Sequence, residues 1–187
     1  MIKAVIFDMD GTIVDSEPIY ERVNDEIYEK YGFDLTQADY NRHLGANLRD
    51  VWTDILERHP VKEEFSHYKI EDFMEEHIHS YYQGLKEADD LELMPNVEHW
   101  FQFFKEHGYQ MIIASSSYAP VIKYIYQRFG LERYMEGYVD GNSIENGKPA
   151  PASVVAFNRA QDESQDFSNA DLIIEDYSPE NLNKILA

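Results

Sequence analysis

Side chains that can act as nucleophiles, acids, metal ligands and phosphate ligands are concentrated in four short segments of this sequence. Each segment comes after a stretch that we predict to be a β-strand. The segments are Asp8-Met9-Asp10-Gly11-Thr12, Ser115-Ser116-Ser117, Gly147-Lys148-Pro149 and Glu175-Asp176. Ligands of open parallel sheets bind beyond the carboxyl ends of the strands, so we expect these side chains to converge on one rim.

This combination of side chains meets the needs of phosphoryl transfer through an aspartate. A carboxylate can attack phosphorus to give an aspartyl-phosphate, which divides one difficult displacement into two easier ones. A second carboxylic acid two residues later can protonate the leaving oxygen and then deprotonate the attacking water. Mg²⁺ takes one or two carboxylates together with phosphate and water, and it would let an acidic site accept an anionic substrate. A lysine and a hydroxyl can orient the phosphoryl oxygens and offset their charge.

Short apolar stretches alternate with helical periodicity along most of the chain. Residues 3–7 form an apolar run that ends in carboxylates, which is typical of a buried parallel strand. Further strands are predicted at residues 109–114, 137–139 and 171–174. Helices are predicted at residues 18–32, 47–56, 65–82, 95–107, 121–129 and 153–160, and from residue 179 onward.

The order of these elements predicts the fold class and the domains. Strands that alternate with helices indicate an α/β fold with a doubly wound parallel sheet covered on both faces. Residues 16–88 are helical in pattern throughout and too long for a simple crossover, so we predict an inserted all-α cap domain. The core domain is then discontinuous and comprises residues 1–15 and 89–187.

The charge balance restricts the class of partner. Sixteen basic residues stand against 36 acidic ones, which gives a formal net charge of -20. This field repels nucleic acid and anionic membranes, so neither is an expected partner. The chain has no cysteine, which excludes disulfides, thiolate metal sites and cysteine nucleophiles. No signal peptide or membrane-spanning run is recognisable, and we expect a cytoplasmic protein.

The four segments together resemble the motifs of the haloacid dehalogenase-like hydrolase superfamily. The first motif is matched by Asp8 to Thr12 with Ile13-Val14-Asp15-Ser16-Glu17 after it, and the second by Ile112-Ile113-Ala114-Ser115. The third is matched by Gly147-Lys148-Pro149-Ala150-Pro151, and the fourth by Ile174-Glu175-Asp176 with Glu180. All four occur in order, and the helical block stands where the family's first cap type is inserted. The resemblance therefore implies a Rossmann-like core and the branch of phosphatases and beta-phosphoglucomutases.

The resemblance also implies roles for the acidic residues. Asp8 would be the nucleophile and a ligand of Mg²⁺. Asp10 would be the general acid and base and would offer the metal its backbone carbonyl. Asp176 would bind Mg²⁺, directly or with Glu175 through water. An Asp at the end of a strand can instead cap the following helix, and for Asp176 this alternative stays open.

Phosphate binding and substrate selection fall to other residues in the resemblance. Ser115, Ser116 and Lys148 would hold the phosphoryl group, although Ser115 could simply cap a helix and Lys148 could be an exposed turn residue. In the cap, Arg49 is a candidate to hold a second anionic group, because its guanidinium pairs bidentately with carboxylate or phosphate. The alternative is a solvent-facing Arg49 paired with a neighbouring acid. Asn47 and Glu17 are further candidates for substrate selection.

Two positions distinguish between branches of this superfamily. Dehalogenating members carry a tyrosine where this chain has Asp10, and beta-phosphoglucomutases carry a histidine where it has Tyr20. The second aspartate indicates phosphate-ester hydrolysis or mutase chemistry, and Tyr20 counts against a mutase without excluding it. We therefore predict a phosphatase of a small phosphorylated metabolite. A regulatory protein that binds phosphate without turnover and a sugar-phosphate mutase remain the alternatives.

The carboxyl-terminal part of the chain departs from the family pattern. The sequence ends at Ala187, soon after the fourth motif, and Tyr177 stands where relatives commonly have a serine directly after the aspartate. An exposed edge of the sheet could then pair with a second copy, which makes a homodimer possible. His77 and His79 are not predicted to form a zinc site, because positions two apart on a helix do not face one another.

Overall fold

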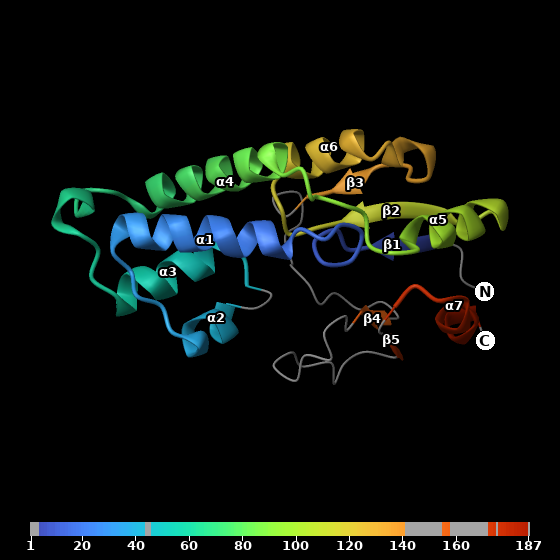
Figure 1. Ribbon diagram of the computed structural model, residues 1–187, viewed down its shortest axis with the longest axis horizontal. Helices are drawn as coiled ribbons and strands as arrows, with labels where there is room; N and C mark the ends of the chain where they lie inside the picture. The colour runs from blue at the N-terminus through green and yellow to red at the C-terminus, as the bar shows by residue number, and fades with distance from the viewer. Residues whose placement is uncertain (1–3, 44–45, 141–154, 158–171, 175, 187) are drawn as a thin grey trace. The chain divides into compact units, whose positions relative to one another are not determined.

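The chain folds into two compact units, Met1–Asp15 with Leu91–Ala187 and Ser16–Asp90 (Figure 1). The computed structural model describes residues 4–43, 46–140, 155–157, 172–174 and 176–186. The first unit is mixed α/β and contains the parallel strands, whereas the described part of the second unit is helical. None of the described helices combines the length and the apolar character that crossing a bilayer requires.

Three parallel strands form the main sheet of the first unit. Strands β1 (Ala4–Phe7), β2 (Gln110–Ala114) and β3 (Tyr138–Val139) lie in the order β1-β2-β3 (Figure 1). Phe7 is in register with Ile113, so the carboxyl ends of β1 and β2 lie side by side. The predicted strands at 3–7, 109–114 and 137–139 are thereby confirmed to within one residue.

Aromatic packing covers one face of this sheet. Helix α5 (Val97–Glu106) places the rings of Phe101 and Phe104 at 5.1 and 6.1 Å from the ring of Phe7. Phe7, Met111 and Ile113 are buried, as the alternation of side chains along a strand requires for one shared face. The unit continues with α6 (Ala119–Arg128) and the 3-10 turn η2 (Leu131–Arg133).

The last part of the first unit holds a second parallel pair of strands. Strand β4 (Val155–Phe157) pairs with β5 (Leu172–Ile174), and α7 (Pro179–Leu186) follows. The predicted helix at residues 153–160 is wrong, because Val155–Phe157 pairs as a strand. A short apolar run fits a buried strand as well as a helix, so its periodicity does not settle which of the two forms.

The second unit consists of α-helices and one short 3-10 turn. Its elements are α1 (Glu17–Tyr31), α2 (Gln37–His43), α3 (Leu48–Arg58), η1 (Glu63–Phe65) and α4 (Ile70–Glu87). Gly32 ends α1 at a φ of 86°, and the side chain of Asn47 caps α3 by accepting the Asp50 N–H at 3.0 Å. Both ends were predicted from the sequence, whereas α2 was not.

The predicted helix at residues 65–82 is displaced in the structure. Residues 63–65 form η1, and α4 begins at Ile70, where the Asp72 carboxylate accepts the Lys69 N–H at 2.7 Å. This capping interaction selects the start of the helix, and apolar periodicity alone did not reveal it. The helix continues past Gly84 to Glu87.

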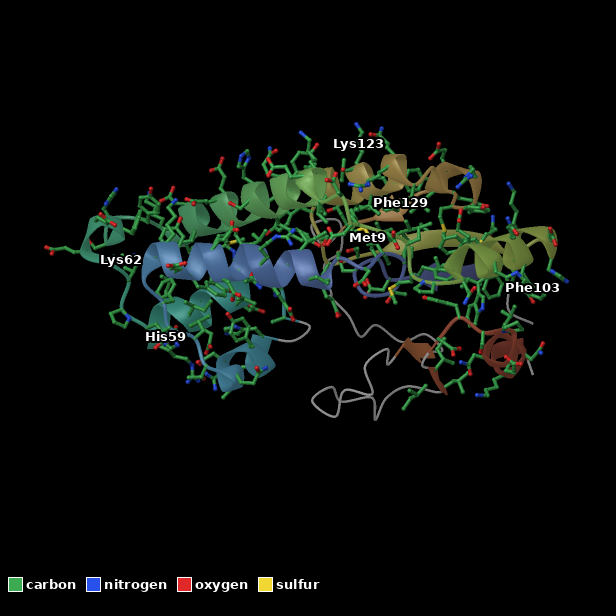
Figure 2. All side chains as sticks on the ribbon, in the orientation of Figure 1. Met9, His59, Lys62, Phe103, Lys123 and Phe129 are labelled. Carbon is green, nitrogen blue, oxygen red and sulfur yellow. The ribbon has the colours of Figure 1, made fainter. Side chains whose placement is uncertain are left out.

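Helices α1 and α4 run side by side along the second unit (Figure 1). They approach closely at Gly84, where an added Cβ would lie 2.9 Å from Cγ2 of Val23. Lys62, labelled in Figure 2, caps the carboxyl end of α1: its Nζ donates to the carbonyls of Glu29 and Lys30 at 3.0 and 2.8 Å. Such donors satisfy carbonyls that a helix end leaves without partners.

An aromatic core surrounds one histidine in the second unit. Trp52 packs on Phe73 and Tyr31, with ring centroids at 5.1 and 5.9 Å, and its centroid lies 5.9 Å from that of His77. His77 is buried, and within the described part of the chain neither of its ring nitrogens has a hydrogen-bond partner. Burial lowers the pKa of His77 to about 4, so the ring is neutral near pH 7.

Candidate functional site

The loop after β1 presents two carboxylates from a tight turn. Asp8 follows the strand directly, and its Oδ1 accepts the Met9 N–H at 2.8 Å. The Met9 side chain is fully buried beneath the loop (Figure 2), and its carbonyl accepts the N–H groups of Thr12, Ile13 and Val14. Gly11 adopts a φ of 66°, which a residue with a side chain rarely does. The turn thus fixes Asp8 and Asp10 on one short segment at the end of the strand.

The segment after β2 brings serine hydroxyls to Asp10. Ser117 Oγ donates to Asp10 Oδ2 at 2.7 Å, and Ser115 Oγ donates to the same oxygen at 3.4 Å. The Ser117 N–H in turn donates to Ser115 Oγ at 3.0 Å. Ser115 itself is anchored to the next strand, because its N–H donates to the Val139 carbonyl. Two of the predicted site residues, Asp10 and Ser115, therefore lie together across 105 positions of sequence.

Ser117 is the member of this cluster that sequence reasoning did not select. The run of three serines carried the signal, but the second of them was chosen as a phosphate ligand instead. Ser116 is exposed, and its side chain makes none of the hydrogen bonds of the cluster, whereas Ser117 is half-buried against Asp10. Which hydroxyls of the run face the acid depends on the bend of the backbone after β2.

Asp176 lies at the start of α7 and is held by that helix. Its Oδ1 accepts the Ser178 N–H at 2.9 Å and the Asn181 side-chain amide at 2.8 Å. The hydrogen bonds from Ser178 hold the pKa of the Asp176 carboxyl below its usual value, so the group is ionised near neutral pH. The hydrogen bonds from Ser178 and Asn181 both use Oδ1. The residue that caps α7 is instead Ser178, whose Oγ accepts the Asn181 N–H at 3.4 Å, so the predicted capping by Asp176 itself is wrong.

Tyr177 connects the fourth motif to the first. Its hydroxyl donates to the Thr12 carbonyl at 3.0 Å, and its own carbonyl accepts the Trp100 Nε1–H at 2.9 Å. The Tyr177 and Trp100 rings pack edge to face with centroids 4.8 Å apart. Burial and the nearby negative charge of Asp8 raise the pKa of the Tyr177 hydroxyl. Tyr177 therefore ties the segment of Asp176 to the loop that follows Asp8.

The remaining predicted site residues fall into two groups. Lys148 and Glu175 lie outside the described residues. The cap candidates Arg49, Asn47 and Glu17 lie in the helical unit. Arg49 donates from both terminal nitrogens to Glu71 Oε1 at 3.1 Å, and both side chains are exposed. Arg49 thus adopts the ion pair that was the alternative to a substrate contact.

The oxygen donors of the site fit Mg²⁺ in kind. The expected ligands are the carboxylates of Asp8 and Asp176 and the backbone carbonyl of Asp10, and Mg²⁺ prefers such hard oxygen ligands. No group of three or more His, Cys, Asp or Glu side chains placed to hold a metal ion occurs in the described part of the chain. The expected Mg²⁺ ligands do not require such a group, because only two of them are side-chain carboxylates and the third is a backbone carbonyl.

Comparisons with known proteins relate the whole arrangement to one family. The family model described as haloacid dehalogenase-like hydrolase matches residues 2–161. The phosphorylated carbohydrates phosphatase of Thermotoga maritima is 29% identical over 150 residues, covering 80% of this chain and 66% of that protein. The fructose-1-phosphate phosphatase of Escherichia coli is 26% identical over 151 residues, covering 79% and 73%. The chain thus spans about two thirds of the length of the first of these relatives.

A solved structure matches the fold over nearly the whole chain. CbbY from Rhodobacter sphaeroides, crystallised with phosphate, superposes with a TM-score of 0.81 at 15% sequence identity. The match covers 96% of each chain. The α/β core with helical insertion is therefore the fold of this family.

Proposed function

Since the chain belongs to the haloacid dehalogenase-like hydrolase family, we propose that it is a magnesium-dependent phosphohydrolase that cleaves a small phosphomonoester. The observation that carries the proposal is the pairing at the sheet rim. Asp8 stands at the end of β1, and two residues later Asp10 is held by serine hydroxyls from the end of β2. This arrangement supports the proposal that the Asp8 carboxylate attacks phosphorus and that Asp10 transfers protons.

The reaction divides into two displacements at phosphorus. In the first, an oxygen of Asp8 attacks phosphorus, and the bond between phosphorus and the ester oxygen breaks. The leaving oxygen keeps the bonding electron pair and takes a proton from the carboxylic acid of Asp10. In the second, Asp10 takes a proton from a water molecule whose oxygen attacks phosphorus. The bond to Asp8 then breaks, which releases inorganic phosphate and restores both carboxyl groups.

Mg²⁺ would be held by the Asp8 carboxylate, the Asp10 carbonyl and the Asp176 carboxylate, with Glu175 acting through water. When bound, it would neutralise charge on the phosphoryl oxygens and allow an anionic ester to approach an acidic site. The ionised state of Asp176 suits such a role. Ser115 and Lys148 would orient the phosphoryl oxygens.

The substrate class follows from the relatives and from the cap. Two of the phosphatases that resemble this chain are named for phosphorylated carbohydrates and fructose 1-phosphate. A small phosphorylated metabolite is therefore the proposed substrate. The helical unit would act as the cap that selects it, as lids commonly do in enzymes that must exclude water. Arg49 would bind a second anionic group of the substrate in place of Glu71, with which it forms an exposed ion pair.

The test is the release of p-nitrophenol from p-nitrophenyl phosphate with and without Mg²⁺. Asp8→Asn removes the nucleophile, and we expect its kcat to fall by about a thousandfold or more. Asp34→Asn is the matched control, because Asp34 is exposed in the helical unit and its change leaves the site intact. Full activity in Asp8→Asn, or no turnover by the wild-type chain with Mg²⁺, would reject the proposal.

A further inference from the structure

Two serine hydroxyls donate to the same oxygen of Asp10 at different distances. The distance to Oδ2 is 2.7 Å from Ser117 Oγ and 3.4 Å from Ser115 Oγ. The first distance is typical of a strong O–H···O bond, and the second is close to the limit at which such a bond contributes. Ser117 is therefore the serine that fixes the orientation of the Asp10 carboxyl.

The hydroxyl of Ser115 is disposed for a different partner. It accepts the Ser117 N–H at 3.0 Å, which anchors its oxygen, while its proton is directed to Asp10 over a long distance. A phosphoryl oxygen can take that proton without disturbing the bond between Ser117 and Asp10. The Ser115 hydroxyl can thus donate to the substrate while the Ser117 hydroxyl continues to donate to Asp10.

We propose that Ser117 is a positioning residue for Asp10, an inference that rests on the proposed phosphohydrolase function. The Ser117 hydroxyl donates to Oδ2 at 2.7 Å and thereby fixes the orientation of the Asp10 carboxyl group. A carboxyl group held in one orientation transfers a proton to the leaving oxygen, and later takes one from water, more efficiently than a mobile one. Ser117 itself touches neither the substrate nor the reacting phosphorus.

The choice of leaving group separates this role from a structural one. An alkoxide leaves only with a proton, whereas p-nitrophenolate is a stable anion and leaves almost without help. Loss of a positioned general acid therefore slows glycerol phosphate hydrolysis far more than hydrolysis of p-nitrophenyl phosphate. A defect in folding or in phosphate binding slows both esters alike.

The experiment compares kcat and KM on both esters, with Mg²⁺ present, for the wild-type chain and five variants. For Ser117→Ala we expect the ratio of kcat/KM on glycerol phosphate to kcat/KM on p-nitrophenyl phosphate to fall by about ten- to a hundredfold, because kcat/KM reports the first displacement, in which the leaving group departs. Its KM and its inhibition by inorganic phosphate stay close to wild type. Ser115→Ala instead raises KM and weakens inhibition by phosphate on both esters.

Two conservative variants and one control complete the design. Ser117→Thr keeps the hydroxyl and restores the ratio, whereas Ser117→Cys keeps the size with a weak donor and lowers it. This pair decides the matter even if Ser117→Ala does not fold. Ser66→Ala removes an exposed hydroxyl of the helical unit that donates to Glu63, and it leaves the ratio unchanged.

The outcomes test the positioning role of Ser117 separately from the proposed phosphohydrolase function. A wild-type chain that turns over neither ester rejects the phosphohydrolase and this inference with it. An active wild type whose ratio is unaltered in both Ser117→Ala and Ser117→Cys rejects only the positioning role. An equal loss on both esters with a raised KM would make Ser117 a phosphate ligand and also overturn the proposal.

Discussion

The hydroxyl of Tyr177 is a single contact whose removal tests how the fourth motif is held. Tyr177→Phe keeps the buried ring against Trp100 and removes the hydroxyl that donates to the Thr12 carbonyl. Thr12 is half-buried, so water can reach the orphaned carbonyl, and the loss is close to the net value of one hydrogen bond. We expect the free energy of unfolding to fall by about 1 kcal/mol, against about 3–5 kcal/mol for Tyr177→Ala, which also leaves a cavity.

The same change loosens the tie between Asp176 and the loop of Asp8. If the lost hydrogen bond contributed fully to holding the metal ligands together, the Kd for Mg²⁺ rises by about fivefold. Calorimetric titration with Mg²⁺ measures this directly, without turnover. Urea unfolding followed by tryptophan fluorescence measures the stability, in a Trp52→Phe background that leaves Trp100 as the reporter of the first unit.

Tyr109→Phe is the matched control for this prediction. Tyr109 packs on Phe104, and the described structure gives its hydroxyl no hydrogen bond, so the change should alter neither stability nor Mg²⁺ affinity. If Tyr177→Phe behaved like this control in both measurements, the link between the first and fourth motifs would carry no free energy. The reasoning about Tyr177 would then be wrong.

Two further predictions concern the helical unit. Between pH 6.5 and about 4, His77 binds a proton in the unfolded chain but not in the folded one. The free energy of unfolding therefore falls by up to about 3 kcal/mol as the pH is lowered through this range, and its full value is present above pH 6.5. His77→Phe should remove this part of the pH dependence. The check is the urea midpoint of both proteins across this pH range, and midpoints that fall equally with pH in the two proteins would contradict the prediction. Gly84→Ala sets a Cβ 2.9 Å from Cγ2 of Val23 and 3.3 Å from Cγ2 of Ile19, and we expect it to destabilise by about 1–3 kcal/mol. In a double-mutant cycle with Val23→Ala, purely additive effects would contradict this steric explanation.

Local sequence patterns predicted most elements of the fold. The apolar run before Asp8, the glycine after α1 and the Asn47 cap each act within a few residues, and the structure confirms the strand and helix ends that they indicate. The strand at Val155–Phe157 was missed because its identity depends on pairing with β5, about fifteen residues further along the chain. The start of α4 was misplaced because an Asp72 cap outweighed the apolar periodicity.

By itself, the sequence determined which side chains could carry phosphoryl transfer and at which strand ends they stand, because residue type and short-range periodicity are properties of the local chain. Only the tertiary structure decided that Ser117 rather than Ser116 meets Asp10, and that Tyr177 joins Thr12 across 165 positions. Those contacts follow from the register of β1 with β2 and from the packing of Tyr177 on Trp100. A hydrogen bond selects its partner within a few tenths of an ångström, and that precision arises only once distant segments have packed together.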